Sequence, residues 1–263
     1  MNTLSSKASA SLRTDLSGQL ALVTGAGSGL GSRFASVLAA AGARVIICGR
    51  RRERLEELAK AIIDAGGEAI VEVMDVRNAA ALRQRIAELT QTHGIIDILV
   101  NNAGVGTSSS ALETDIEAMD QLYATNVRAP FILASEVARI MITRERPGKI
   151  VNIASVGAFH YSPGMNAAFY CACKAAVVRM TEALAMEWAR HGINVNAIAP
   201  GLFETEMTQA PLSRHRERMI ERLPRKRVGQ PHQLDSTLLY LVSPDSAFVT
   251  GLCLRVDDAQ YPR

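Results

Sequence analysis

The sequence lacks any apolar run of about twenty residues, the length that a helix needs to cross a bilayer. It has only four cysteines, at positions 48, 171, 173 and 253, with no CxxC pair and none beside a histidine at zinc-ligand spacing. A disulfide scaffold and a metal site are therefore not expected, and the cysteines favour a reducing compartment such as the cytoplasm. The net charge of +3 comes from basic residues interleaved with acidic ones, which gives no basis for nucleic-acid binding.

The first fifteen residues are rich in Ser, Ala and Thr but lack the apolar core of a signal peptide. We expect residues 1–15 to form a flexible tail. The remaining residues, 16–263, are enough for one large domain and few for two. They contain no internal repeat and no linker-like segment.

Short apolar runs alternate with longer amphipathic stretches, which is typical of repeated βα units around a parallel sheet. The apolar runs predict seven strands, at Leu20–Val23, Arg44–Cys48, Ala69–Met74, Asp97–Val100, Lys149–Ile153, Asn194–Ile198 and Leu252–Val256. The stretches between them predict helices at Gly31–Ala41, Glu53–Ala65, Ala79–Thr92, Asp115–Arg144, Ala167–Arg190 and Gln233–Val242. Because the runs are continuously apolar, we expect helices on both faces of the sheet. The sequence thus predicts one α/β, doubly wound Rossmann-type domain with a seven-stranded, mostly parallel sheet.

A glycine-rich run, TGAGSGLG, extends from Thr24 to Gly31 between the first predicted strand and the first predicted helix. Glycines permit a tight turn and close backbone approach, and the helix N-terminus offers N–H groups to a pyrophosphate. The spacing is TGxxxGxG, and NNAG follows the fourth predicted strand at positions 101–104. In these motifs the chain resembles the short-chain dehydrogenase/reductase family, classical type, over about residues 16–258, and in particular its 3-oxoacyl-thioester reductases.

The second predicted strand ends in Gly49, Arg50 and Arg51, where an acidic residue would favour NAD(H) by binding the adenosine 2′-hydroxyl. Here Gly49 leaves room for a 2′-phosphate, and the paired N–H donors of the following arginine guanidinium groups match phosphate oxygens. These arginines could instead be a solvated helix start, although cations at a helix N-terminus are unfavourable without a compensating anion. We therefore expect NADP(H) in preference to NAD(H).

The resemblance implies a wider set of dinucleotide contacts. The glycine turn would contribute Gly25, Ser28, Gly29, Leu30 and Gly31, and the adenine would be framed by Asp75 and Val76. The remaining implied contacts are Asn102, Ala103 and Gly104 beside the adenosine ribose, and Pro200, Gly201 and Thr205 beside the nicotinamide carboxamide.

Tyr170 and Lys174 lie four residues apart at the start of a predicted helix, so their side chains share one face. The resemblance implies a catalytic set of Asn126, Ser155, Tyr170 and Lys174, with Tyr170 as general acid/base and Ser155 orienting the substrate oxygen. Lys174 would also bind the nicotinamide ribose. A free tyrosine has a pKa near 10, and lowering it to about 7 requires about 4 kcal/mol from neighbouring positive charges.

Pro130 lies four residues after Asn126 and has no N–H, so the Asn126 carbonyl loses its helical partner. That carbonyl could hold a water that links Lys174 to solvent, the relay that the resemblance implies; alternatively, Pro130 only kinks a long helix. Ser155 and Tyr170 are fifteen residues apart, about two more than is usual in the family. We expect the longer loop, 157–166, to reshape the substrate pocket, with His160 more plausible as a surface residue than as a substrate contact.

Residues 204–231 break the alternation and predict an irregular substrate lid over one sheet edge. Its many Arg and Lys residues, among them Arg225 and Lys226, admit an anionic substrate such as a 3-oxoacyl thioester on a carrier. They equally admit a solvated face paired with Glu217 and Glu221. Sugars, polyols, steroids and simple ketones are further substrate candidates.

The sequence thus predicts an oxidoreductase that moves a hydride between NADP(H) and a ketone or secondary alcohol, with a 3-oxoacyl thioester as the leading substrate. A catalytically silent dinucleotide sensor or scaffold is the main alternative, and another Rossmann-type enzyme such as a methyltransferase is the third. In the family, helices like those predicted at Asp115–Arg144 and Ala167–Arg190 pack across a two-fold axis, so we expect a homodimer or homotetramer.

Overall fold

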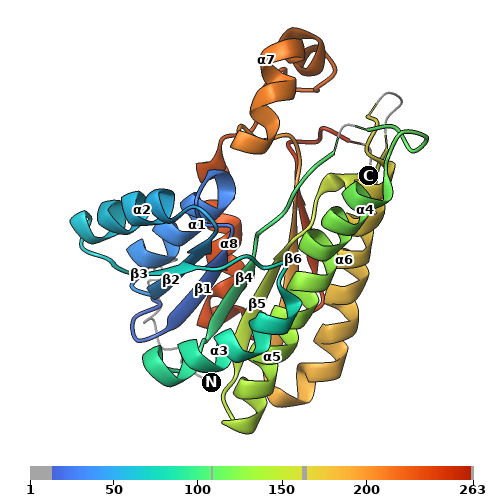
Figure 1. Ribbon diagram of the computed structural model, residues 1–263. Helices are drawn as coiled ribbons and strands as arrows, with labels where there is room; N and C mark the ends of the chain where they lie inside the picture. The colour runs from blue at the N-terminus through green and yellow to red at the C-terminus, as the bar shows by residue number, and fades with distance from the viewer. Residues whose placement is uncertain (1–13, 108, 162–164, 262–263) are drawn as a thin grey trace, which may run out of the picture.

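The computed structural model describes residues 14–107, 109–161 and 165–261, and in this part of the chain the strands form one seven-stranded sheet (Figure 1). The strand order is β3-β2-β1-β4-β5-β6-β7, and every neighbouring pair is parallel. The strands are β1 Leu20–Thr24, β2 Arg44–Gly49, β3 Glu68–Val73, β4 Ile98–Asn101, β5 Gly148–Ile153, β6 Ile193–Pro200 and β7 Cys253–Val256. The predicted doubly wound α/β fold is confirmed. Of the expected tail, residues 1–13 lie outside the described residues.

Helices cover both faces of the sheet (Figure 1). One layer contains α1 (Gly29–Ala40), α2 (Arg52–Asp64) and α8 (Asp235–Val242), and the other contains α3 (Ala79–His93), α4 (Ile116–Tyr123), α5 (Ala129–Thr143) and α6 (Ala168–Trp188). Short 3₁₀ turns lie at Val156–Ala158, Ala189–His191, Pro231–Leu234 and Pro244–Ser246. In the described residues, no helix combines the length and apolar character that crossing a membrane requires.

The core explains why the strands are apolar without interruption. Along β1, Ala21 and Val23 pack into the cluster under α1, α2 and α8, whereas Leu20 and Leu22 pack into the cluster under α3, α5 and α6. Successive side chains of a strand point to opposite faces, so a strand covered on both sides needs apolar residues at every position. Together, the two buried layers hold the strands in place, so that their carboxyl ends lie along one edge of the sheet.

The stretch predicted as one helix, Asp115–Arg144, is interrupted. A π-helical segment, Ala124–Arg128, separates α4 from α5, and the Ala129 N–H donates to the carbonyl of Ala124, five residues earlier. Pro130 lies directly after this segment and cannot donate a hydrogen bond. The predicted stretch is therefore helical from Ile116 to Thr143, and the wider π-helical register absorbs the missing donor at this proline.

The segment 204–231 is also more regular than expected, since it contains a 16-residue helix, α7 (Glu206–Glu221). Thr205 and Thr208 form a reciprocal capping box at its start. Leu212, Leu223 and Val228 bury one side of the segment in a small cluster of their own. Pro211 lies inside this helix, and it was one reason for expecting irregular chain here. In Figure 1, α7 projects above the carboxyl ends of the strands.

Candidate functional site

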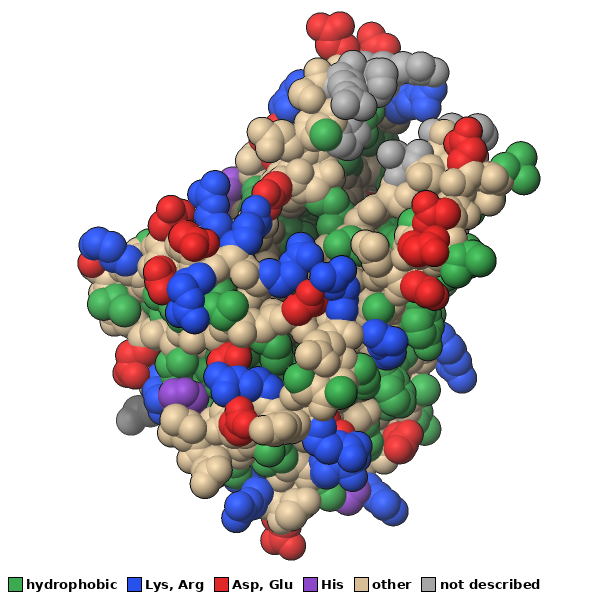
Figure 2. Space-filling view, viewed as in Figure 1, with side chains coloured by type: hydrophobic (Ala, Val, Ile, Leu, Met, Phe, Trp, Pro, Cys, Tyr) green, Lys and Arg blue, Asp and Glu red, His purple; other side chains and the backbone are tan. Residues whose placement is uncertain are grey.

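A pocket of about 610 Å³ lies where the strands end, and the turns after β1 to β6 all contribute to its wall. The central strands β1 and β4 flank the point where the strand order reverses, which is where open α/β sheets bind ligands. The space-filling view is hollowed below α7, and acidic and basic side chains alternate over this face (Figure 2). The volume falls in the usual range for small-molecule and cofactor sites.

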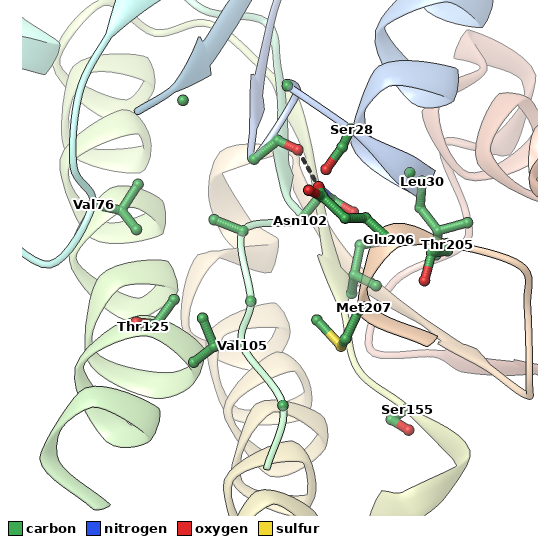
Figure 3. Close-up of a pocket in the computed structure, with 18 of the residues that line it drawn as sticks. Ser28, Leu30, Val76, Asn102, Val105, Thr125, Ser155, Thr205, Glu206 and Met207 are labelled. Atoms are coloured by element: carbon green, nitrogen blue, oxygen red, sulfur yellow. Dashed lines mark hydrogen bonds between the residues drawn. The ribbon is translucent and has the colours of Figure 1, made fainter. Parts of the chain in front are cut away.

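The glycine turn after β1 is built so that other backbone can approach it. Gly25 has a φ of +67°, and a Cβ at Gly31 would collide with the Gly25 carbonyl oxygen and with the Asn102 side chain. Asn102, labelled in Figure 3, donates through Nδ2 to the carbonyls of Thr24 (2.9 Å) and Gly25 (3.2 Å). Asn102 thereby ties the turn after β4 to the turn after β1.

The N-terminus of α1 points its free N–H groups into this pocket. Ser28 is the N-cap residue, and among the described residues its side chain accepts no capping hydrogen bond and the first turn of α1 has no acidic residue. Such a terminus attracts an anion because its N–H groups and the helix dipole both favour negative charge. The turn therefore fits a dinucleotide pyrophosphate.

The turn after β2 presents its two predicted arginines differently. Arg51 donates to both carboxylate oxygens of Glu206, the first residue of α7, at 2.7 Å each, and to the Ser28 hydroxyl at 3.2 Å. Arg50 lines the same pocket, is exposed, and has no ion pair within the described chain. Its positive charge helps to lower the pKa of Asp75, although the main cause is the bidentate bond from Arg77. Arg50 is therefore the free cation of this turn.

The four residues expected to be catalytic come from three elements and converge. Lys174, on α6, donates from Nζ to the Ile153 carbonyl at 2.8 Å, and its Nζ lies 5.8 Å from the centre of the Tyr170 ring. Ser155 follows β5, and its hydroxyl accepts from the Gly157 amide at 3.1 Å. Asn126 lies in the π-helical segment, only 1% exposed, and both its amide atoms bond the backbone of Val105, at 3.0 and 2.9 Å.

The backbone of Gly104 brings two of these residues together. A Cβ built on Gly104 would lie 3.1 Å from Asn126 Oδ1 and 3.6 Å from Lys174 Nζ. Any larger residue would press on both polar groups. Tyr170, Lys174 and Ser155 also line the pocket that the glycine turn borders. Ser155 lies at the opposite end of the close-up from Ser28 (Figure 3).

Burial dominates the electrostatics of the Tyr170–Lys174 pair. Desolvation raises the pKa of Tyr170, and hydrogen bonding to Ser155 opposes that rise. Desolvation also lowers the pKa of Lys174 to about 8. The polypeptide alone therefore does not move the phenol toward neutrality as the sequence led us to expect. The reason is that Lys174 is itself desolvated and directs its hydrogen bond to the Ile153 carbonyl.

Most of the predicted dinucleotide contacts line the pocket: Gly25, Ser28, Gly29, Leu30, Arg50, Arg51, Val76, Asn102, Ala103, Gly104, Tyr170, Lys174, Pro200, Gly201 and Thr205. Three predicted site residues, Gly31, Asp75 and Asn126, do not line it and instead support residues that do. Lining residues outside the predicted contacts include Gly106, Gln121 and Thr125, together with Glu206 and Met207 from the predicted lid, 204–231.

The carboxamide end of the predicted site is held by the C-terminal segment. Leu202 donates its amide to Gln260 Oε1 at 2.7 Å, and a Cβ on Gly201 would lie 2.9 Å from the Asp257 Cα. Asp258 and Ala259 adopt left-handed backbone conformations, with φ of 51° and 58°. Non-glycine residues are strained there, and such strain persists only when the surroundings enforce it. In the added loop, His160 stacks on Tyr261 at 4.7 Å between ring centres.

Three basic side chains among those that the structure describes in the segment 204–231 form ion pairs. Arg216 bonds Glu204 at 2.5 Å, and both Arg225 and Arg227 bond Asp258. Lys226 donates to the backbone carbonyl of Glu221. These partners differ from Glu217 and the Glu221 carboxylate, which the sequence offered. The pairing leaves less positive charge for an anionic carrier than composition implied.

Comparison with known proteins agrees with this architecture. Residues 19–215 match the short chain dehydrogenase family. Gluconate 5-dehydrogenase of Gluconobacter oxydans (strain 621H) is 40% identical, and the match covers 92% of this chain and 94% of that one. The 3-oxoacyl-[acyl-carrier-protein] reductase FabG of Rickettsia prowazekii (strain Madrid E) is 35% identical, with 92% and 97% covered.

A solved structure is similar over nearly the whole fold. It is a gluconate 5-dehydrogenase from Burkholderia cenocepacia J2315 in complex with NADP and tartrate, with a TM-score of 0.88 and 38% identity. The alignment covers 94% of this chain and 97% of that one. On sequence, on fold and on the placement of the glycine turn, this chain belongs to the short chain dehydrogenase family.

Proposed function

We propose that this protein transfers a hydride between NADP(H) and a ketone or secondary alcohol, with Tyr170 as the general acid/base. The observation that carries the proposal is the convergence of Ser155, Tyr170 and Lys174 on the pocket that the glycine turn borders. Such a site needs a proton donor where charge develops on the substrate oxygen. A protein that only senses a dinucleotide would not need this donor.

The residues present fit a dinucleotide. The open N-terminus of α1 suits the pyrophosphate, and Arg50, which has no ion pair in the described chain, suits a 2′-phosphate at the turn after β2. The similar B. cenocepacia structure contains NADP. When bound, the dinucleotide supplies or accepts the hydride. We propose NADP(H) as the preferred cofactor on these grounds.

Each of the four residues has a distinct task in the proposed reaction. Tyr170 starts protonated, because burial raises the pKa of its phenol, and it donates that proton to the carbonyl oxygen in reduction. Ser155, whose hydroxyl is fixed by the Gly157 amide, orients the substrate oxygen. Lys174 provides a buried ammonium beside the phenol, and Asn126 holds the chain at Val105 against them. In oxidation the proton returns to the Tyr170 oxygen.

We propose a small polar ketone or secondary alcohol, such as a polyhydroxy acid, as substrate, and a 3-oxoacyl thioester as the second candidate. The 40% identity to a gluconate 5-dehydrogenase supports the first, as does the pairing of the lid cations with Glu204 and Asp258. The 35% identity to a 3-oxoacyl-[acyl-carrier-protein] reductase supports the second. An assay of both substrate classes with NADP(H) and NAD(H) distinguishes them directly.

Removal of the phenol hydroxyl tests the proposed role of Tyr170. We expect Tyr170→Phe to lower kcat by about 10²- to 10⁴-fold, the usual contribution of general acid/base catalysis, while NADPH binding measured by fluorescence persists. Tyr161→Phe, at a residue 47% exposed on the neighbouring loop, is the matched control and should keep wild-type turnover. Wild-type turnover in Tyr170→Phe would refute the role, and an absence of turnover with every carbonyl would favour the silent sensor.

We propose a homodimer or homotetramer located in the cytoplasm. Exposed apolar residues gather on α4 and α5, where Ile116 is 72% exposed and Tyr123 and Phe131 are each 49% exposed. Patches of this kind mark association surfaces in water-soluble proteins. Light scattering after size exclusion would measure the assembly, and cell fractionation the location.

A further inference from the structure

An acidic side chain of the protein, Glu206, lies beside the glycine turn, next to the side chain of the α1 N-cap residue Ser28. The Arg51 guanidinium donates to both oxygens of the Glu206 carboxylate at 2.7 Å, and Glu206 also hydrogen-bonds the Ser28 side chain. Figure 3 shows Glu206 and Ser28 close together. These two hydrogen-bonding partners lower the pKa of Glu206 to about 2, with Arg51 the larger cause. The carboxylate is therefore negatively charged at any physiological pH.

This carboxylate reaches the glycine turn because the first turn of α7 lies against it. A Cβ on Gly29 would lie 3.3 Å from the Thr205 Cβ, and a Cβ on Gly106 would lie 3.4 Å from the Met207 sulfur. The capping box of Thr205 and Thr208 fixes the direction in which α7 starts. Glu206 is thus held in place by the helix start on one side and by Arg51 on the other.

The Arg51 guanidinium cannot donate its full set of hydrogen bonds to the Glu206 carboxylate and to a phosphate group at the same time. A 2′-phosphate bound at the turn after β2 carries nearly two negative charges, as phosphate monoesters do at neutral pH, and would approach the same guanidinium fork. The Arg51 and Glu206 side chains are about half exposed, at 49% and 53%. Exposed ion pairs contribute little to stability, so a phosphate can displace the carboxylate.

We infer that Glu206 determines cofactor specificity by competing with a 2′-phosphate for Arg51. Arg50 remains available to the phosphate throughout, whereas Arg51 becomes available only when Glu206 releases it. Because linkage is reciprocal, a nucleotide with a 2′-phosphate weakens the hold of Arg51 on α7, and a nucleotide without one leaves it intact. The inference rests on the proposed use of this pocket by a nicotinamide dinucleotide.

Two small nucleotides test the inference without turnover. 2′,5′-ADP and 5′-AMP differ only in the 2′-phosphate, and calorimetric titration of the full chain measures their binding. We expect Glu206→Gln to bind 2′,5′-ADP about fivefold more tightly than the wild type, the lower end of typical coupling, with 5′-AMP changed less than about twofold. Glu217→Gln removes an exposed charge from the same helix and should change neither.

Adding Arg51→Met to Glu206→Gln should abolish the gain for 2′,5′-ADP, because no guanidinium remains to be released. Equal tightening for both nucleotides would overturn the inference, since Glu206 would then oppose the shared 5′-phosphate. Unchanged or weaker binding of 2′,5′-ADP would also overturn it.

Failure of the proposed function gives a different pattern. A wild type that binds 5′-AMP as tightly as 2′,5′-ADP would contradict the NADP(H) preference alone, and the ratio between Glu206→Gln and wild type would still decide the role of Glu206. A wild type that binds neither nucleotide would overturn both proposals.

Discussion

Burial of the Lys174 ammonium lowers the free energy of unfolding, and replacing Lys174 with an apolar side chain should show by how much. Lys174 is 5% exposed, and desolvation lowers its pKa from 10.5 to about 8. At 1.36 kcal/mol per pKa unit, charging this residue costs the folded state about 3 kcal/mol at pH values below 8. Lys174→Met removes that cost but leaves the Ile153 carbonyl without its donor, which costs about 1–3 kcal/mol.

The dependence on pH separates these two effects. Between pH 8 and 10.5 the unfolded lysine still binds its proton and the folded one has released it, so the stability of the wild type rises with pH. The lost hydrogen bond of the variant does not depend on pH. We expect the free energy of unfolding of the wild type to rise by about 2 kcal/mol relative to that of Lys174→Met between pH 8 and 9.5. Near pH 7 the two proteins should be similarly stable, or the variant more stable.

Urea unfolding of both proteins at one protein concentration, at several pH values, measures this difference. The comparison cancels the effect of Cys171, since burial raises the pKa of its thiol in both proteins. A constant difference in stability across this range would refute the reasoning, because it would mean that Lys174 keeps its ordinary pKa in the fold. Turnover of Lys174→Met should be lost in either case, which separates stability from activity at this position.

Two further predictions concern the walls of the pocket. Gly31→Ala should destabilise the glycine turn and abolish NADPH binding in a fluorescence titration, because the added Cβ collides with the Gly25 carbonyl. Gly27→Ala is the control and should bind NADPH normally, since its Cβ would lie 3.6 Å from the nearest atom. Equal effects of the two substitutions would contradict the steric argument. Gln260→Ala should raise the KM for the dinucleotide about five- to tenfold, because the substitution removes the 2.7 Å hydrogen bond that the buried Gln260 side chain accepts from the Leu202 amide. An unchanged KM would show that the turn after β6 keeps its shape without this bond.

The fold was predictable because its pattern is local. Each strand is a short apolar run with a turn residue after it, and the two buried layers on either side of the sheet demand that pattern. The glycine turn was predictable in part for the same reason, since Gly31 must clear the Gly25 carbonyl within the turn itself, whereas the contacts of both glycines with Asn102 are long-range. The placement of Tyr170 and Lys174 followed from their spacing on one helix.

The π-helical segment and α7 were not predictable in this way. A π-helical hydrogen bond spans five residues instead of four, and the sequence signals only the missing donor at Pro130, not the register that replaces it. Within α7, Pro211 argued locally against a helix. Its tertiary support comes from the burial of Leu212 against Leu223 and Val228. Packing of this kind routinely overrides local propensity.

Long-range polar pairs were the least visible part of the site. Arg51 meets Glu206 from 155 positions away, and Leu202 meets Gln260 from 58 positions away. No spacing rule connects residues so distant, and each looks like a surface residue in its own segment. Yet Glu206 begins the helix that projects over the pocket, and Arg51 ends the turn after β2 that the proposed dinucleotide would contact. Under the proposed function, a substitution in the first turn of α7 acts on both halves of the site, and we expect substrate and cofactor preferences to change there together.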